Sequence, residues 1–561
     1  MVNVTVALTG ALPAVVIISA VLTAFASVCL LRLYQRAVVR AMHAQSGDAS
    51  TAVSHSIMPT ASGAAPKPVL TMIPSPARPA ESSAAGTAYR RAILSLRQLA
   101  CVYALGGLAY ALVLATAWMI TARGGFYPVR FLWLLSCYAW PVILAVHLIT
   151  PGDGVRVTIA YFAMIAVVGA TALVSSPDLT IGRLVFFWFF ATGPGTVLLL
   201  AFLNRHVRAV GPLVLAFMLA AVTGAFVAVN TAGSDERLLL GIVDVGGRLG
   251  LRATAIFVLL HLIGFSLFGV LGWWLLLWIG RRYREKRMSD QSITLDALWL
   301  LFGVVQSFTL VFEGWGWIFT GGVAFAVYKL VVLTGLSLIR QERGEGAASR
   351  VLLLLRVFSL GKRSQRLFDA LSMIWLRTGS IHLIAGPDLA TATVEPHEFL
   401  DFIGGHLSRR FVQGEADLDQ RLVHLDTQPD PDGRFRVNEF FCRANTWQST
   451  MQRLAGGSDA VLMDLRSFSH SNQGCIYELR QLMDIVPIDR VIFAIDDSTD
   501  QHFLETTLSD IWKQMEPSSP NAGAVNPAIR CFSLGQQNAS AVERLLVSLF
   551  ESQPSLTRQE T

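Results

Sequence analysis

Charged side chains are scarce in this sequence of 561 residues. Asp, Glu, Lys and Arg together make up 15% of the chain, whereas hydrophobic residues make up 53%. Soluble globular domains have about 25% charged residues, so this composition predicts that most of the chain lies in lipid. The six cysteines include no C-x-x-C pair and no His-Cys cluster at ligand spacing, which argues against a disulfide framework and against a structural zinc site.

Two phosphate-handling motifs are also missing. No G-x-x-x-x-G-K-S/T run occurs, which excludes a P-loop nucleotide site. No acidic pair follows the first apolar run of the C-terminal region, residues 351–358, although a phosphoacceptor receiver domain needs such a pair to hold Mg²⁺. The net charge of +6 is explained by the basic inner loops of a membrane protein, so no nucleic-acid partner is predicted.

Long hydrophobic stretches recur through the first 340 residues, and each is close to the roughly 20 residues that cross a hydrocarbon core. Basic residues follow the first stretch rather than precede it, which indicates a retained span and not a cleaved signal peptide. The sequence predicts nine spans, at residues 11–31, 99–121, 131–149, 155–174, 184–203, 207–229, 253–279, 295–312 and 317–339.

Arginine and lysine gather in alternate loops between these spans. The densest run, RRYREKR at residues 281–287, falls on the inner side if the N-terminus is outside. Acidic residues such as Asp178 and Asp235 fall in loops on the other side. We therefore expect a multi-pass protein of the lipid bilayer, with its N-terminus outside and its C-terminal region in the cytoplasm.

Composition divides the chain into four parts. Residues 1–40 form an N-terminal transmembrane anchor. Residues 41–90, rich in Ala, Ser and Pro, form a linker that buries too little apolar surface to stay ordered. Residues 91–340 form an eight-helix transmembrane domain, and residues 347–555 have the periodicity of a soluble α/β domain. The predicted fold is a multi-pass α-helical membrane domain followed by a flavodoxin-like, mainly parallel sheet with helices on both faces.

Short apolar runs alternate with helical patterns in the C-terminal region. The predicted strands are residues 351–358, 381–385, 435–441, 460–465, 491–495 and 529–532. The predicted helices are residues 364–377, 395–411, 446–454, a segment that carries Glu478, 501–515 and 540–550.

Ligands of an open parallel sheet gather at the carboxyl ends of its strands, where four predicted loops lie. The loop of residues 359–363 opens a helix, whose N-terminus favours an anion such as a phosphate. A solvated basic turn, with Ser364 capping the helix, explains the same residues without a ligand. The candidate ligand-binding residues in these loops are Ser359, Gly361, Lys362, Arg363, Gly386, Asp388, Ser469 and Ser471.

Glu478 is the candidate catalytic residue. It lies one turn into the helix that follows the strand at residues 460–465, close to the ligand crevice. Cleavage of the bond between nicotinamide and ribose builds positive charge on the sugar, which a carboxylate beside the ring stabilises, as in glycosidases. Two plainer interpretations remain: a carboxylate on the helix surface for Glu478, and a packed core thiol for Cys475.

The arrangement of Ser471, Cys475, Glu478 and Leu479 resembles the box in TIR domains where a serine, a cysteine and a Glu-Leu pair open the helix after a central strand. Residues 356–359 resemble the first TIR box, and the runs VLLLLRVF and GCIYEL are similar to the TIR-like cytoplasmic region of multi-pass bacterial membrane proteins. The resemblance implies a homo-oligomeric TIR-like domain at the bacterial inner membrane, acting in stress or defence signalling. It also implies Glu478 as the catalytic residue and NAD as a substrate, with no cofactor required.

Two other functions stay open at this point. The C-terminal domain fits a non-catalytic module that binds a nucleotide or a protein partner, and in that case Glu478→Gln leaves function intact. A transporter with a regulatory cytoplasmic domain is the third hypothesis, because ionisable residues inside a membrane mark transport paths. Such residues are sparse here: His147, His261 and Lys329, with Asp296 and Glu313 near the span ends.

Overall fold

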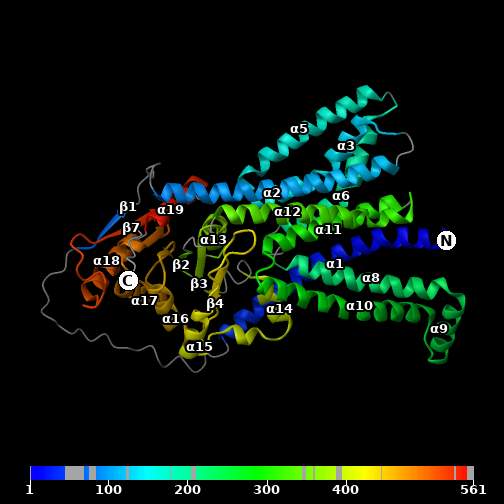
Figure 1. Ribbon diagram of the computed structural model, residues 1–561. Helices are drawn as coiled ribbons and strands as arrows, with labels where there is room; N and C mark the ends of the chain where they lie inside the picture. The colour runs from blue at the N-terminus through cyan, green and yellow to red at the C-terminus, as the bar shows by residue number, and fades with distance from the viewer. Residues whose placement is uncertain are drawn as a thin grey trace. The chain divides into compact units, whose positions relative to one another are not determined.

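The computed structural model contains long helices and one seven-stranded parallel sheet (Figure 1). It describes residues 2–43, 69–74, 84–121, 125–176, 178–203, 210–311, 313–343, 349–357, 361–386, 394–443, 445–535 and 539–552. The chain forms two compact units. The first comprises Met1–Leu33, Leu96–Glu345 and Val394–Leu400, and the second comprises Tyr34–Ser95, Gly346–Thr393 and Asp401–Thr561.

Helices account for nearly all of the first unit. They are α1 (Val2–His43), α2 (Ala84–Thr121), α3 (Pro128–Tyr138), α4 (Trp140–Ile149), α5 (Pro151–Ser175), α6 (Ile181–Leu203), α8 (Gly211–Ser234), α9 (Glu236–Arg248), α10 (Ala253–Arg284), α11 (Asp290–Val311), a 3₁₀ turn (Trp315–Phe319) and α12 (Thr320–Arg343). The predicted span at residues 131–149 is thus divided into α3 and α4, and Pro141 in the first turn of α4 has no N–H to continue α3.

Seven helices among the described residues are long and apolar enough to cross a membrane. They are Ala14–Met42, Ala84–Thr121, Pro128–Ile149, Gly152–Ser175, Gly211–Ser234, Ala253–Arg284 and Gly316–Gln341. These helices coincide with seven of the nine predicted spans. The other two, residues 184–203 and 295–312, lie on α6 and α11. Over its described side chains α6 contributes only the shorter apolar stretch Ile181–Gly193, and the first turns of α11 carry Asp290, Thr294 and Asp296.

Whether α6 crosses the membrane decides the side of α9 relative to the N-terminus, and whether α11 crosses decides its side relative to the C-terminal region. Figure 1 shows α11 running beside α12, and α11 also contacts α4, α6 and α8. Because α11 is packed among spans in this way, we expect all nine segments to cross. Reporter fusions at Ser234 and Gly346 should then report opposite sides of the membrane. Reporters on the same side would mean that α11 does not cross, because α10 and α12 alone return the chain to the side of Ser234.

Close backbone contact holds α8 against α10. A Cβ atom built on Gly224 would lie 2.3 Å from the backbone oxygen of Gly264, so only glycine allows this approach. An ion pair joins α11 to α12, where Lys329 donates a hydrogen bond to the carboxylate of Asp296. These two residues are therefore paired with each other, which supplies a structural reason for charge at this depth.

The second unit is built on a parallel sheet whose strands lie in the order β1-β7-β6-β5-β2-β3-β4. The strands are β1 (Thr71–Pro74), β2 (Arg350–Arg356), β3 (Gly379–Ile384), β4 (Val437–Phe440), β5 (Ala460–Asp464), β6 (Val491–Ile495) and β7 (Ala528–Ser533). Counted from β2 and leaving out the edge strands β1 and β4, the order is 2-1-3-4-5, a common doubly wound arrangement. The predicted parallel sheet is confirmed, and each of its six predicted strands is present.

The helices of the second unit follow the predicted pattern with two exceptions. They are α13 (Lys362–Trp375), α15 (Glu415–Val423), α16 (Trp447–Gly456), α17 (Gln473–Ile485), α18 (Gln501–Gln514) and α19 (Ala539–Glu551). The predicted helix at residues 395–411 is wrong in length, because α14 (Pro396–Ile403) ends before Gly405 at φ +74°, and a 3₁₀ turn follows at Leu407–Arg410. The sequence pattern also missed α15.

The predicted disordered linker, residues 41–90, is wrong in part. Thr71–Pro74 forms strand β1, which pairs in parallel with β7, and the N–H of Thr71 donates to Pro527 O at 3.0 Å. An edge strand of this kind is held by backbone hydrogen bonds, so it needs little of the apolar surface that the linker lacks. Helix α2 also begins within the predicted linker, at Ala84. Residues 44–68 and 75–83 lie outside the described residues.

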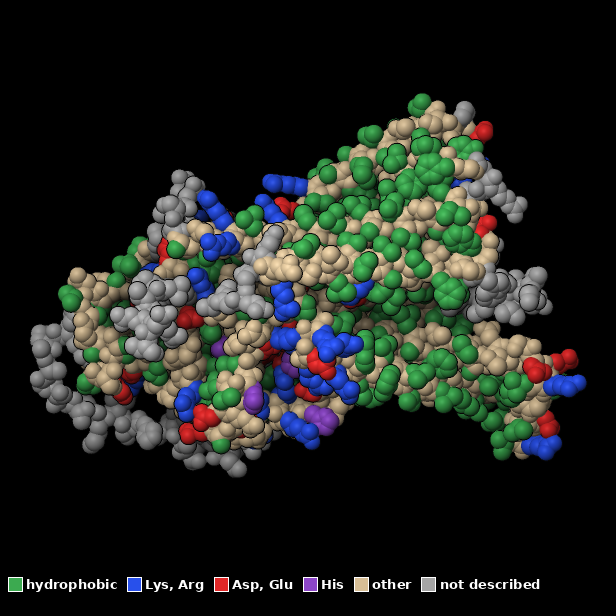
Figure 2. Space-filling model, viewed as in Figure 1, with side chains coloured by type: hydrophobic (Ala, Val, Ile, Leu, Met, Phe, Trp, Pro, Cys, Tyr) green, Lys and Arg blue, Asp and Glu red, His purple; other side chains and the backbone are tan. Residues whose placement is uncertain are grey.

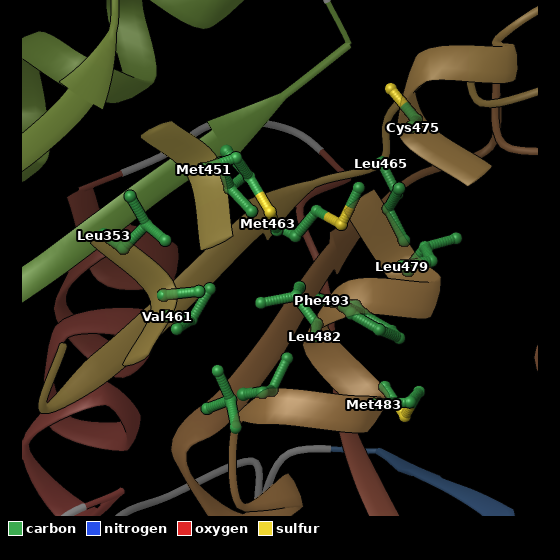
Figure 3. Close-up of a cluster of buried hydrophobic side chains, with 14 of the residues drawn as sticks. Leu353, Met451, Val461, Met463, Leu465, Cys475, Leu479, Leu482, Met483 and Phe493 are labelled. Carbon is green, nitrogen blue, oxygen red and sulfur yellow. The ribbon is translucent and has the colours of Figure 1, made fainter. Parts of the chain in front are cut away.

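The core of the second unit lies between the sheet and its helices. Figure 3 shows Val461, Met463 and Phe493 on adjacent strands facing Leu479 and Leu482 of α17. All five residues of β5 and all five of β6 are buried. Strands covered on both faces are continuous apolar runs in sequence, which is why these two were predicted with nearly their observed bounds.

Candidate functional site

The candidate site lies where β2 and β5 are neighbours in the sheet. From β2 the chain crosses over to β3 on one side, and from β5 it crosses to β6 on the other, so the strand order reverses between these two strands. Doubly wound proteins bind ligands outside the carboxyl ends of the strands at such a point. The helix that leaves β5 is α17, and its first turn lies at the end of β2, where the Cys475 thiol is 4.0 Å from Arg356 O.

Glu478 lies on α17, one turn beyond Cys475, and its side chain is buried. The residue is only 3% exposed, and its Oε2 has no hydrogen-bond partner among the described residues. Burial raises the pKa of Glu478 to about 8, although the positive charge of Arg356 acts in the opposite direction. The carboxyl is therefore mostly protonated at neutral pH. The interpretation of Glu478 as a helix-surface carboxylate is wrong.

Cys475 is a packed thiol. It is 5% exposed and belongs to the main core cluster. Burial raises its pKa well above the usual value, and the nearby carboxyl groups of Glu478 and Asp464 raise it further. A thiol with a raised pKa is a poor nucleophile, so Cys475 contributes packing to the site, as one of the two sequence-based interpretations proposed.

A buried ion pair holds the loop between β5 and α17. Arg466 donates from Nε to Asp464 Oδ1 at 2.7 Å and from Nη2 to Asp464 Oδ2 at 2.6 Å, and both residues are 1% exposed. The same Nη2 donates to Arg363 O at 3.2 Å, which ties this loop to the start of α13. This pair was not predicted from the sequence, although an acidic residue at the end of a strand and an arginine two positions later could have indicated it.

Arg363, predicted to bind an anion, is paired within the protein. It forms a salt bridge with Asp496 at the end of β6, and its Nη1 lies 3.4 Å from Ser467 Oγ. Burial tends to raise the pKa of Asp496, but hydrogen bonds from Ser498 and the charge of Arg363 bring it below the usual value. Asp496 is therefore ionised at neutral pH and neutralises Arg363. An incoming phosphate would have to compete with this carboxylate.

The remaining predicted residues are divided among three loops. Gly361, in the left-handed region at φ +49°, precedes the exposed Lys362 at the start of α13. Ser469 and Ser471 lie together before α17, with their hydroxyl oxygens 2.9 Å apart. Gly386 is buried after β3. Ser359 and Asp388 lie outside the described residues.

These contacts separate the predicted residues into two groups. The first turn of α13 and the loops after β5 and β6 are linked directly, because Ser498 Oγ accepts from the N–H of Ser467 at 3.0 Å and lies within 3.3 Å of Arg363 Nη1. Ser467 itself has a φ of +61°, an uncommon conformation for a residue with a Cβ atom. In contrast, among the described residues no hydrogen bond joins Glu478 to the hydroxyl groups of Ser469 or Ser471. The site therefore has two parts. One is the set of hydrogen-bonded polar side chains around Ser498, and the other is the buried carboxyl of Glu478.

Among the described residues, Glu478 belongs to no metal cluster, and it does not line the polar depression over α15 and α16. Among the residues that the structure describes, no three His, Cys, Asp or Glu side chains come together as metal ligands. A shallow depression of about 340 Å³ lies over the starts of α15 and α16, and its lining includes Thr446, Gln452 and Tyr477 but not Glu478. Comparison of the chain with protein-family models, with curated proteins and with solved structures found no match. The function is therefore inferred from the residues of this chain.

Proposed function

We propose that this chain is a membrane-anchored signalling protein whose TIR-like α/β domain hydrolyses NAD or a related nucleotide, with Glu478 as the catalytic carboxylate. One observation carries the proposal. Glu478 is a buried carboxyl with a raised pKa and with one oxygen that has no hydrogen-bond partner among the described residues, on the helix that leaves the point of strand reversal. A group with a strongly perturbed pKa near the ligand crevice of a doubly wound sheet is a candidate for catalysis.

The chemistry makes use of the raised pKa. The nicotinamide ring of NAD carries a positive charge, and an opposite charge nearby favours the ionised form of a carboxyl. Substrate binding therefore lowers the pKa of Glu478 and ionises it where positive charge develops on the ribose. The bond between ribose C1′ and the nicotinamide nitrogen breaks, with its electron pair leaving on neutral nicotinamide. Water then bonds to C1′ and releases a proton to Glu478 or to solvent.

The membrane part anchors and concentrates these domains. In this proposal the protein lies in a bacterial inner membrane with its N-terminus outside and the α/β domain in the cytoplasm. Confining copies to two dimensions raises their effective concentration, so a weak contact between α/β domains suffices to assemble a homo-oligomer. The proposed role is a response to stress or infection, in which assembly starts nucleotide hydrolysis.

One observation favours a second function, a non-catalytic module that binds a nucleotide or protein partner. Glu478 is 3% exposed, so a substrate reaches it only after a change in this structure. The first turn of α13 and the linked loops after β5 and β6 offer polar groups that bind a partner without that change. Transport is less well supported, because Lys329 and Asp296, two of its candidate residues, are paired with each other.

The test is NAD cleavage by the full chain, reconstituted at high density in lipid vesicles with the α/β domain facing the assay medium. We expect release of nicotinamide by the natural protein and a loss of at least about 100-fold in Glu478→Gln, the size of effect expected for a main electrostatic contact in the transition state. Glu505→Gln, which changes an exposed carboxylate on α18, is the matched control and should keep full activity.

Two results would contradict the proposal. Equal cleavage by the natural protein and Glu478→Gln would remove Glu478 from the mechanism. The absence of cleavage by all three proteins, at a density where the α/β domains are shown to cross-link to one another, would favour the binding module.

A further inference from the structure

Helix α9 is amphipathic and joins two membrane-length helices. It begins two residues after α8 ends and finishes five residues before α10 begins. Its N-terminus is fixed by Asp235, whose carboxylate accepts from the N–H groups of Arg237 and Leu238. Figure 1 shows α9 lying across the end of the α8–α10 pair. Since α8 and α10 have the length and composition of spans, α9 lies at one boundary of the membrane.

One side of α9 is apolar and uncovered. Leu238, Ile242, Val245 and Leu249 recur at helical spacing and lie on one face. Three of them are well exposed, with Leu238 at 43%, Val245 at 58% and Leu249 at 71%. A short helix that leaves this much apolar surface in water gains free energy when the surface is covered.

The charged residues of α9 lie on the other side. Arg237, Asp244 and Arg248 share a face, and Arg248 forms a salt bridge with Asp244 at 2.7 Å. In Figure 2, charged side chains gather at the α9 end of the helix pair, whereas the surface along α8 and α10 is mainly hydrophobic.

The contact between α9 and α10 orients these two faces. Gly246 lies against Ile256 near the start of α10, and a Cβ atom built on this glycine would be 2.4 Å from Ile256 Cδ1. Counting about 100° per residue, Ile242 lies about 40° around the helix from Gly246 and Val245 about 100°, whereas Arg237 and Arg248 lie about 160° to 180° away, on the far side. The apolar face therefore turns toward the lipid around the α8–α10 pair, and the charged face turns away from it.

We propose that α9 lies in the bilayer interface, with Leu238, Ile242, Val245 and Leu249 in contact with acyl chains and its charged face among headgroups and water. The bound partner is a lipid surface recognised through apolar area. Residues 235–252 carry three acidic and three basic side chains, so headgroup charge adds little to the binding. Membrane contact of α9 should therefore be insensitive to the fraction of anionic lipid and to salt.

The test places a fluorescent thiol label on each face of α9 in the full chain. Val245→Cys and Leu238→Cys report on the apolar face, and Asp244→Cys, next to Val245 in sequence, is the matched control on the charged face. Cys29 and Cys101, which are not buried, are first replaced by Ser. Each labelled protein is reconstituted in phosphatidylcholine nanodiscs with brominated acyl chains, and quenching by lipid is compared with quenching by aqueous iodide.

We expect the labels at Val245 and Leu238 to be quenched several-fold more by brominated lipid than the label at Asp244, with the reverse order for iodide. Adding phosphatidylglycerol or salt should leave this pattern unchanged. Strong iodide quenching at both faces would place α9 in water and overturn the proposal. Protection of Val245 and Leu238 from both quenchers would overturn it as well, because the apolar face would then be covered by protein, such as a second copy of the chain.

Discussion

Glu478→Gln should stabilise the α/β domain by an amount that grows with pH, reaching on the order of 4 kcal/mol above about pH 8. The natural carboxyl is buried, with a pKa raised from 4.5 to about 8 in the folded protein. Glutamine has nearly the same shape and carries no ionisable proton. The substitution therefore removes the cost of burying a charge while keeping the packing.

The direction of this effect follows from proton binding. Between pH 4.5 and 8 the folded protein keeps the proton of Glu478, whereas the unfolded chain has released it. The free energy of unfolding of the natural protein therefore falls as pH rises through this window, and the loss is complete above pH 8. Near pH 4 the carboxyl is protonated in both states, so natural and Glu478→Gln proteins should there be about equally stable.

Hydrogen exchange of peptides from β5 and α17 measures this in the full chain, at pH 5, 7 and 9 and after correction for intrinsic exchange rates. Protection in Glu478→Gln should exceed that in the natural protein at pH 9 and approach it at pH 5. Glu505→Gln, on the exposed side of α18, should show no such change. A natural protein with the same pH dependence as Glu478→Gln would mean that Glu478 is ionised in the folded state.

Asp464→Ala should cost about 3–5 kcal/mol of folding free energy, because it leaves the guanidinium of Arg466 buried without a counterion. Both side chains are 1% exposed, and two hydrogen bonds join them. The double substitution Asp464→Leu with Arg466→Met removes both charges and should cost far less than Asp464→Ala. The pair also positions the loop before α17, so Asp464→Ala should loosen the site as a whole.

These differences in folding free energy are measured by urea unfolding of the α/β domain within the full chain, with limited proteolysis as the readout. Asp510→Ala is the matched control, because Asp510 pairs with Lys513 at 3.3 Å on the exposed side of α18. Exposed pairs contribute less than about 1 kcal/mol, so this control should be close to the natural protein. A cost for Asp464→Ala no larger than that of Asp510→Ala would show that Arg466 reaches solvent or another partner.

The strands and helices of the α/β domain were predictable where their burial is regular. Val491–Ile495 is covered on both faces and was predicted with its observed bounds. Strand β1 was not predictable from composition, because Thr71–Pro74 is held by the backbone of β7, more than 450 residues later in the chain. The break between α14 and the next 3₁₀ turn was not predicted, because the apolar pattern of the predicted helix at residues 395–411 continues past Gly405.

The candidate site was predictable in outline. Position along the helix made Glu478 a candidate, and the first turn of α13 and the loops after β5 and β6 do meet at one edge of the sheet. The pairing of Arg363 with Asp496 was not visible, since these residues are 133 positions apart. The Asp464–Arg466 pair was within reach of the sequence, because Asp464 lies in the predicted strand at residues 460–465 and Arg466 follows that strand directly, but no pairing between them was predicted.

Residue type and spacing were sufficient for the apolar helices and for the alternation of strands and helices, because both depend on local periodicity and on apolar area. The order of the strands, the burial of Glu478 and the outward turn of the charged face of α9 required the folded chain. Each of these depends on neighbours that are remote in sequence, and the free energy of a charge or an apolar face is set by what surrounds it in space.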